Sequence, residues 1–523
     1  MNFKKNPKPS TSNSPSPRRV QAQWLMVLLL GAPEFASAND AALLEVLRNN
    51  KLITDTQYAE LKNAALPAAA PIERGIPQAD QDVLDVLLAN ELITQAQFAA
   101  LRIKLGQEKM TNPEAKPALK EGFKLQTQDK TFTAQLGTYF QLDSAIYGND
   151  ETDFSSGTEL RRGRLSLGGT LFSDWDYKFE ADFAGTTQGG TTNTVTVTDA
   201  FVRWTGLRPV AITAGSFKVP FGLEAVGSAK YTTFVERGLP FAFVNLRRLG
   251  GMASTNGDNW TGSIGLFGDP VSSQNNDDEG QQVAGRFTFA PWFEADRALH
   301  LGISGGWISP QQTTLAAGSA GRFQETIAFR SKPESNIMSD SLTASTGLTA
   351  AGRTFGRSSG RLVDTGNIPG NVNSYSLAAA EIAGVYGPWS LQGEYTRAVV
   401  DRDRSGDLSF DGYYLYGSWF VTGESRNYRG DKGVFDVVTP RELFNPQFGG
   451  WGAWELAARY STLDLNDGTV AGGEIKDLTL GLNWYPNAYV RVMANYVSVM
   501  GVEGGAHDGD NPNLFQLRLQ FAY

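Results

Sequence analysis

The 523-residue sequence has no cysteine, only two histidines and no long apolar run beyond its first thirty residues. Without cysteine, the chain can form neither a disulfide framework nor a cysteine-based metal site. No later stretch approaches the ~20 apolar residues that a membrane-spanning helix needs. The net charge of −9 disfavours nucleic acid as a partner. If this chain crosses a membrane, it must do so as a closed β-barrel, which satisfies every backbone polar group.

The N-terminus has the three parts of an export signal. Basic residues from Lys4 to Arg19 precede the apolar run 24–30, and Ala36-Ser37-Ala38 forms an A-x-A cleavage site before Asn39. A buried helix is the alternative interpretation, but the flanking residues favour a signal peptide over residues 1–38. The missing cysteine agrees with export, because a free thiol is a liability in an oxidising compartment.

Residues 39–105 contain a duplication at an offset of 40. LLEVLRNNKLITDTQYAELK (43–62) matches VLDVLLANELITQAQFAALR (83–102). Apolar residues three and four apart predict a short helical hairpin in each copy. Because such small units bury little apolar surface alone, each needs a partner. We favour a periplasmic oligomerising collar of the coiled-coil kind; the alternative is a tether to the cell wall. Residues 106–121 are predicted to be a linker.

The apolar pattern changes to a period of two in the rest of the chain, residues 122–523. In the last segment Phe515, Leu517 and Leu519 alternate with Gln516 and Arg518. One apolar and one polar face are what a lipid-facing barrel strand requires. Aromatic residues recur at predicted strand ends beside short turns, which is typical of a girdle at the membrane interface.

Connectors of two alternating kinds divide this region into sixteen strands. Short turns are predicted at 173–175, 206–208, 256–258, 291–297, 387–388 and 486–487. Longer polar loops are predicted at 144–159, 185–194, 218–243, 269–281, 309–373, 400–408, 464–474 and 500–512, with one longer connector, 422–451, on the turn side. Outer-membrane barrels have even strand numbers, and sixteen strands leave an aqueous channel. We predict an all-β, sixteen-stranded antiparallel transmembrane barrel.

Eight motifs of the barrel region resemble the phosphate-selective porins O and P. In chain order they are TELRRGRLSLGG, TDAFVRWTG, AGSFKVPFGLE, SAKYTTFVERGLP, FRSKPES, LVDTGNI, GPWSLQGEY and GWGAWELAARYS. The resemblance covers residues 122–523 and implies a homotrimer in the outer membrane, in contact with lipid and lipopolysaccharide. It also implies inward-folded loops and an anion pathway made of an arginine ladder and a central lysine.

The first candidate residues come from the motifs of the early strands. Arg161 and Arg162 in LRRGRL match the family's arginines near the constriction. Adjacent strand positions point to opposite faces, so only one of the two faces the lumen unless the strand is bulged. Lys230 in SAKYTTFVERG is the candidate for the central lysine, and Lys218 in SFKVPFG is the fallback. The alternative for Lys230 is a solvated loop lysine, or one paired with Glu224 or Glu236.

FRSKPES matches the arginine ladder through Arg330 and Lys332, which lie two positions apart and share a face. Thr326 and Ala328 occupy the preceding same-face positions, so the ladder is shorter than in strongly phosphate-selective members. Three arginines of the fifth loop are candidates to compensate: Arg353, Arg357 and Arg361. The shorter ladder bears on selectivity for phosphate more than on the passage of anions.

The residue types support anion passage independently of the resemblance. Arginine presents a planar fork to two oxyanion oxygens, and lysine presents a point charge. Several weak sites conduct where one deep site would trap an ion. The alternative is that Arg161, Arg162 and Arg164 only balance lumenal acids, such as Glu180 or Asp199. Asp182 is a third acid of this kind.

We predict passive, anion-preferring diffusion of phosphate or related small oxyanions. The alternatives are a weakly selective porin and a structural or adhesive barrel. Two G-x-S-x-G sequences, at 302–306 and 356–360, do not precede helices as a nucleophile elbow must. We therefore predict no enzymatic activity and no cofactor.

Overall fold

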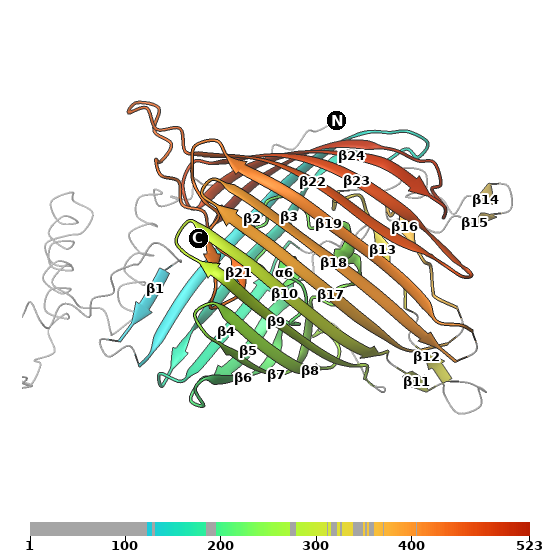
Figure 1. Cartoon of the computed structure of the whole chain (residues 1–523), viewed down its shortest axis with the longest axis horizontal. Helices are drawn as coiled ribbons and strands as arrows, with labels where there is room; N and C mark the ends of the chain where they lie inside the picture. Colours follow the sequence, from blue (N-terminus) through green and yellow to red (C-terminus); the bar gives the residue numbers. More distant parts are fainter. Residues whose placement is uncertain are drawn as a thin grey trace, which may run out of the picture. The chain divides into compact units, whose positions relative to one another are not determined.

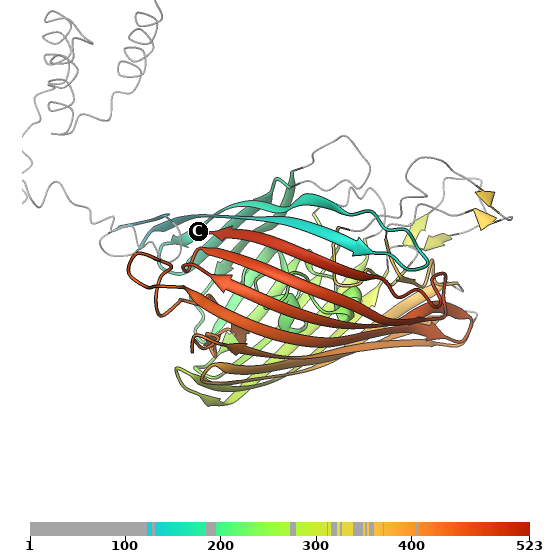
Figure 2. The ribbon, with the colours of Figure 1, turned by 90° about the horizontal axis from the view of Figure 1, so that it is seen from above.

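A computed structural model shows the chain as an antiparallel β-barrel of tilted strands (Figures 1 and 2). It describes residues 123–127, 131–184, 195–271, 279–310, 327–337, 360–369, 371–403 and 405–523, with short strand segments at 312–314, 322–324, 349–350 and 353–354. The predicted signal peptide, tandem repeat and linker, residues 1–121, lie outside these ranges. Within these ranges, no helix has the length and apolar character needed to cross a bilayer.

Sixteen strands form the barrel wall. They are β2 (Thr133–Gly148), β3 (Gly157–Leu171), β4 (Trp175–Asp182), β5 (Thr196–Trp204), β6 (Val210–Lys218), β7 (Arg247–Asn256), β8 (Trp260–Phe267), β9 (Gln281–Phe293), β10 (Arg297–Ser309), β17 (Val372–Tyr386), β18 (Trp389–Arg402), β19 (Leu408–Phe420), β22 (Ala453–Asp467), β23 (Val470–Tyr485), β24 (Val490–Glu503) and β25 (Asn513–Ala522). Each pairs with the next along the chain, and β25 closes the barrel by pairing with β2, for example Gln520 with Gln141. β1 (Phe123–Gln126) adds to the first residues of β2. The predicted all-β, sixteen-stranded antiparallel barrel is confirmed.

Alternating side chains separate the lumen from the outer surface. In β23 Leu478, Leu480 and Leu482 are exposed on the outside, whereas Thr479 and Asn483 are fully buried. Tryptophan pairs stack across neighbouring strands at the turn side of the barrel. These pairs are Trp175–Trp204, Trp389–Trp419 and Trp454–Trp484. We call them the turn-side girdle, since aromatic rings collect where a barrel meets the membrane interface.

The six short turns fall where the sequence predicts them, and so do seven of the eight loops. The exception is 464–474, which is not a long loop. β22 continues to Asp467 and β23 begins at Val470, so only two residues join them. Gly468 has a φ of 56°, a left-handed conformation that suits a tight hairpin. The polar residues 464–474 suggested a loop in the sequence. In the structure they belong to β22 and β23, which remain paired up to the turn.

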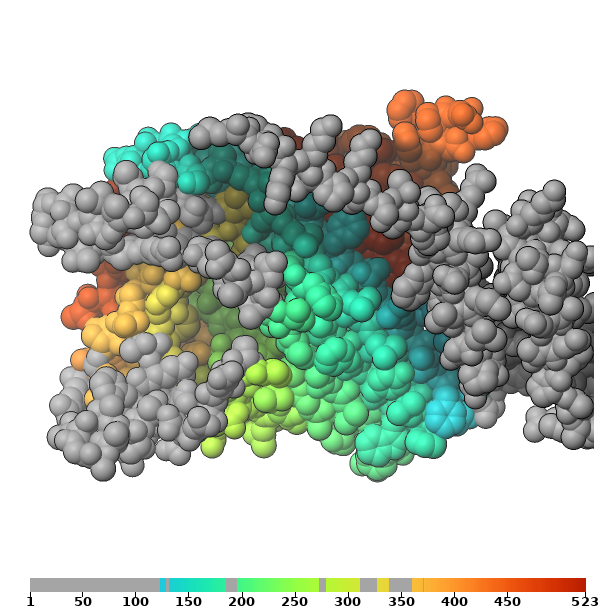
Figure 3. Space-filling view, turned by 180° about the vertical axis from the view of Figure 1, so that it is seen from behind, coloured from blue at the N-terminus to red at the C-terminus, as the bar shows by residue number. Residues whose placement is uncertain are grey.

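Three connectors shape the interior. The third loop, L3 (219–246), carries α6 (Leu223–Val226) and η1 (Leu239–Phe243). The fifth loop, L5 (310–371), carries three two-stranded pairs, β11 (Gln312–Thr314) with β12 (Arg322–Gln324), β14 (Thr349–Ala350) with β15 (Arg353–Thr354), and β13 (Arg330–Ser331) with β16 (Val363–Asp364). The turn-side connector (421–452) contains β20 (Tyr428–Arg429) and β21 (Val434–Phe435). Another part of it, drawn in orange, stands out from the barrel in Figure 3.

Candidate anion pathway

L3 is fixed inside the barrel by arginines of the wall. Arg491 donates to the carbonyls of Thr232, at 2.6 Å, and Thr233, at 3.0 Å. Arg459 donates to the carbonyl of Glu236 at 3.0 Å, and Arg518 donates to that of Val235. Because guanidinium groups present several donors in a fixed fork, three of them hold successive peptide groups of the loop. These bonds place the segment 228–238 against the inner faces of β22, β24 and β25.

A bulge turns both arginines of LRRGRL toward the lumen. β2 and β3 are in register up to Gln141 opposite Arg162, and the next pair is Leu142 opposite Leu160. Arg161 is therefore the extra residue of the bulge. Arg162 donates to the side-chain oxygen of Gln141 at 2.6 Å. This is the condition under which we expected both side chains to face inward.

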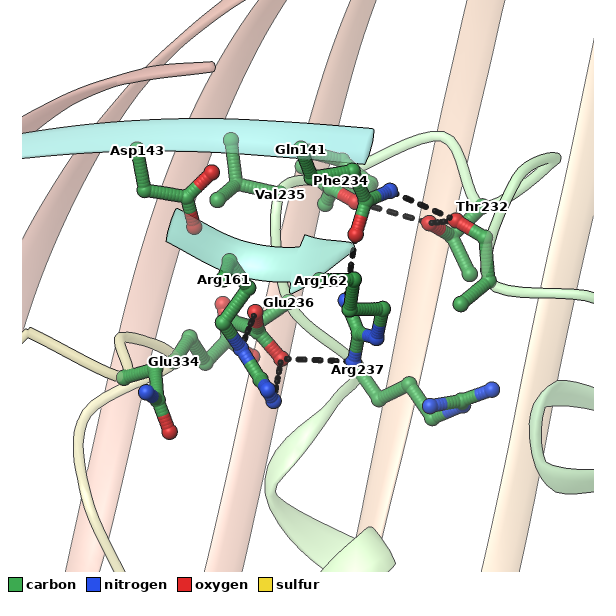
Figure 4. A network of polar contacts seen from close by, with 12 residues as sticks. Gln141, Asp143, Arg161, Arg162, Thr232, Phe234, Val235, Glu236, Arg237 and Glu334 are labelled. Carbon is green, nitrogen blue, oxygen red and sulfur yellow. Dashed lines mark hydrogen bonds and ion pairs between the residues drawn. The ribbon is translucent and has the colours of Figure 1, made fainter. Parts of the chain in front are cut away.

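Glu236 of L3 gathers three of the lumenal arginines around one carboxylate. Figure 4 shows two of them, Arg161 and Arg162, beside Glu236. Arg161 binds it in bidentate fashion at 2.8 and 3.3 Å, and Arg518 binds it at 2.7 Å. Arg162 lies 3.9 Å from its second oxygen. Burial alone would raise the pKa of Glu236, but these guanidinium groups outweigh it and hold the pKa well below its usual range. Much of the positive charge of Arg161 and Arg162 is therefore compensated.

Lys230 lies on L3 with its ammonium 5.2 Å from the ring centre of Tyr139. Arg164 lies 5.5 Å from the same ring, so two cations share one aromatic side chain. Among the described residues, no carboxylate forms an ion pair with the Lys230 ammonium. Burial lowers the pKa of Lys230; the nearby carboxylate of Glu180 opposes this effect, and the charge of Lys178 adds to it. The two acids expected as its alternative partners bind arginines instead, Glu236 as above and Glu224 through Arg459 at 3.7 Å.

Lys218, the fallback candidate for the central lysine, binds the backbone of L3. Its ammonium donates to the carbonyl of Val226 at 3.0 Å and to that of Gly227 at 2.5 Å. It therefore binds the end of α6, whose first N–H groups are bound by Glu394 at 2.8 Å. The donors of Lys218 serve the shape of L3, which leaves Lys230 as the stronger candidate of the two.

L5 contains a second set of cationic side chains. Arg330 pairs with Asp364 at 3.2 Å, and Lys332 donates to the carbonyl of Asn336 at 2.8 Å. β13 ends at Ser331, so the alternating strand that would align Arg330 with Lys332 as a ladder is only two residues long. Burial lowers the pKa of Lys332 to about 8, and the nearby charge of Arg361 contributes. Arg361 is partly buried; the side chains of Arg353 and Arg357 lie outside the described residues.

Glu334 anchors this part of L5. Its carboxylate lies 2.5 Å from Arg459 and also accepts a hydrogen bond from Thr479. Its φ of 47° is unusual for a residue with a side chain, and such a conformation persists only where the surroundings fix it. Arg459 thus connects L3, through the carbonyl of Glu236, with L5, through Glu334.

The wall carries its own paired charges. Arg164 binds Asp182 at 2.7 Å and Glu180 at 3.1 Å. Lys178 and Arg247 both bind Asp199, each at 2.6 Å. Arg164 therefore balances lumenal acids, as the alternative interpretation of the sequence proposed for it.

Comparison with known proteins identifies the family. The model of the phosphate-selective porin O and P family matches residues 134–357 and 343–523. The chain belongs to this family. Porin O of Pseudomonas aeruginosa is 29% identical over 433 residues, which cover 77% of this chain and 91% of that protein. An uncharacterized protein of Caulobacter vibrioides is 27% identical over 410 residues, 74% of each chain.

Two solved structures are only distantly similar to this chain. An anion-selective porin from Comamonas acidovorans is 13% identical, with a TM-score of 0.44 over 75% of this chain and all of that one. OmpT of Vibrio cholerae, folded in vitro, is 11% identical, with a TM-score of 0.44 over 75% of this chain and 98% of that one. Membership of the porin O and P family makes the chain an outer-membrane porin, which is a channel protein.

Two acids, Glu236 and Glu334, organise the loops of this porin. The sequence suggested Glu236 only as a possible partner of Lys230 and did not single out Glu334. Both lie inside family motifs, SAKYTTFVERGLP and FRSKPES, whose cations were the candidates for the anion pathway. The wall arginines that bind L3 and L5 left a clearer signal. Arg459, Arg491 and Arg518 occupy polar positions in strands that alternate strictly, which places them on the lumenal face.

Proposed function

We propose that this porin passes anions in preference to cations, and that its solutes are phosphate or related small oxyanions. Lys230 carries the proposal. It is a lumenal loop cation that forms no ion pair with a carboxylate among the described residues, and its ammonium faces the ring of Tyr139. A cation beside a low-dielectric wall attracts anions more strongly than it would in water. The proposed pathway also includes Lys332 and Arg361 of L5, with Arg330 at its edge.

Phosphate as a solute is supported by two observations. The family whose model matches is described as phosphate-selective, and Porin O belongs to it by name. Lysine and arginine at several separate points along the lumen provide weak successive sites, which favour conduction over trapping. Arg161 and Arg162 contribute less than their motif implies, because Glu236 compensates them.

The test is the reversal potential of reconstituted channels in gradients of potassium chloride and potassium phosphate. We expect the parent to be anion-selective and Lys230→Glu to become unselective or cation-selective. Arg441→Glu is the matched control, since Arg441 is exposed on the turn-side connector beyond the segment that packs beside Lys230. Cation preference in the parent would contradict the proposed function. Equal selectivity in both variants and the parent would contradict the assignment of Lys230.

A weakly selective porin is the second candidate, and the charge pairing in the lumen favours it. Glu236 and Glu334 compensate arginines that would otherwise extend the ladder, and Asp364 does the same for Arg330. In this case potassium and chloride would permeate at similar rates, and added phosphate would not reduce the chloride current. Block of the chloride current by phosphate distinguishes a phosphate-binding pathway from a general one.

We also propose that the porin is a homotrimer and that residues 39–105, after cleavage behind Ala38, form a periplasmic collar. The match of each repeat to the other over 43–62 and 83–102 supports paired helical hairpins. Contact of this repeat with the cell wall is the alternative. Cross-linking of the native protein with and without the repeat tests the collar.

A further inference from the structure

The turn-side connector carries an exposed aromatic hairpin outside the barrel, residues 443–451. Its large apolar side chains face away from the protein: Leu443 is 61%, Phe448 86% and Trp451 64% exposed. The stretch 443–454 (LFNPQFGGWGAW) contains no charged residue, and Arg441 and Glu442 stand at its base. Singly exposed apolar residues are common, but a cluster of this kind marks a surface that contacts a partner or a membrane.

Hydrogen bonds within its own backbone close the aromatic hairpin. Asn445 and Gly450 exchange N–H···O bonds of 2.9 and 3.0 Å, and Phe448 donates to Asn445 at 3.0 Å. The carbonyl of Trp451 accepts the indole N–H groups of Trp454, at 3.2 Å, and Trp484, at 2.9 Å. A segment that enters a membrane interface needs such internal bonding, because unpaired peptide groups are costly away from water.

The hairpin is continuous with the turn-side girdle. Phe444 packs edge-to-face on Trp484 with ring centres 5.0 Å apart, and Trp484 stacks on Trp454 at 5.6 Å. Trp454 and Trp484 lie at the turn-side ends of β22 and β23. From there, exposed leucines continue along the lipid-facing side of both strands. These leucines are Leu456, Leu478, Leu480 and Leu482. The aromatic surface therefore extends from the barrel wall onto the connector without a polar break.

β22 and β23 are long enough to cross the hydrocarbon of a membrane. β22 has 15 residues and β23 has 16. At ~3.3 Å per residue and a tilt of ~45°, such strands rise ~35 Å, more than the ~25 Å apolar band of an outer-membrane barrel. Their turn-side ends, and the aromatic hairpin beside them, therefore lie at the level of the membrane interface.

We propose that the aromatic hairpin lies in the interfacial region of the periplasmic leaflet and binds phospholipid as a second membrane anchor. Aromatic side chains suit the boundary between head groups and acyl chains, and the uncharged sequence lets the hairpin enter it. Arg441 and Glu442 remain at the aqueous side. The same connector also contacts the lumen, where Arg286 donates to the carbonyl of Gly433 at 2.8 Å. In this proposal lipid binds one part of the connector, and the barrel interior binds another. The inference rests on the outer-membrane location and not on anion selectivity.

The absence of cysteine provides a direct test. Phe448→Cys introduces a single thiol for an environment-sensitive fluorophore, and Lys432→Cys on the same connector is the matched control. Both are reconstituted as full-length protein in vesicles of phosphatidylethanolamine and phosphatidylglycerol. We expect the label at 448 to be quenched several-fold more by doxyl groups near the head of the acyl chain than by aqueous iodide. The label at 432 should show the opposite preference.

Two outcomes would overturn the proposal. If iodide reaches position 448 as readily as position 432, the hairpin is in water. If neither quencher reaches 448, protein covers it, and a second copy of the chain becomes the partner. Since Phe448 is 86% exposed, its replacement removes little packing, and heat-resistant migration of the barrel checks that the variant is folded. Reversal potentials of the same preparation report on the anion pathway separately.

Discussion

Replacement of Glu236 by glutamine is expected to increase anion selectivity. Its carboxylate compensates Arg161, Arg162 and Arg518, with oxygen–nitrogen distances of 2.7 to 3.9 Å. Asp143 remains bound to Arg518 at 2.6 Å in the variant, so one positive charge is gained at the lumenal face of L3. Because the pKa of Glu236 lies well below its usual range, the carboxylate is ionised at neutral pH, and the substitution removes a full charge.

The size of the effect follows from Coulomb's law. A unit charge acts on an ion 4 Å away with about 1 kcal/mol in water and about 4 kcal/mol at an effective dielectric constant of 20. Since 1.4 kcal/mol is a factor of ten, the smaller of these energies raises the anion-to-cation permeability ratio about fivefold, and we expect a rise of at least this size. Loss of one partner from a buried ion pair also costs stability, about 3–5 kcal/mol. The bonds from Arg459, Arg491 and Arg518 to the L3 backbone remain to hold the loop.

The assay is the reversal potential in a potassium chloride gradient, measured at low and at high salt. The gain should be large near 0.1 M and small near 1 M, where the Debye length falls from about 10 Å to about 3 Å. Glu442→Gln, at an exposed position of the turn-side connector, is the control and should change nothing. An unchanged permeability ratio, or a larger conductance whose selectivity does not depend on salt, would show that L3 had moved and that the charge argument is wrong.

Three further predictions follow from other parts of the chain. Raising the pH from 7 to 9 should reduce anion selectivity, because Lys332, with a pKa of about 8, loses its positive charge over this range. Lys332→Arg should abolish this pH dependence. An equal change of selectivity in both proteins would show that another group causes it. Deletion of residues 521–523 should leave the protein in the periplasm, because these residues help to close β25 on β2. Phe521 stacks on Phe140 at 5.6 Å, and Tyr523 forms backbone hydrogen bonds with Thr138. Normal outer-membrane levels in a fractionation experiment would contradict this prediction. Deletion of residues 41–105 should weaken the oligomer in native electrophoresis without changing the conductance of each barrel, whereas loss of cell-wall association with an intact oligomer would support the tether.

The sequence by itself determined the wall of this porin. Alternation such as Leu478, Leu480 and Leu482 against Thr479 and Asn483 is local, because a strand repeats every two residues and each face has one solvent. Turn and loop lengths then set the number of strands. The exception at 464–474 shows the limit of this reasoning, because polar residues on a strand pair near its turn look the same as a loop.

Only the tertiary structure decided which lumenal charges are compensated. Arg161 and Glu236 are 75 positions apart, and Arg518 lies 282 positions beyond Glu236, so their meeting depends on how L3 folds into a closed barrel. Lys218 and Lys230 look equivalent in the sequence, yet one binds the carbonyls of Val226 and Gly227 and the other faces an aromatic ring. The bulge that turns Arg161 inward is likewise a property of the pairing of β2 with β3. The partners of a charged loop side chain are set by the part of the barrel wall against which the loop packs. The local periodicity of the sequence carries no information about that contact.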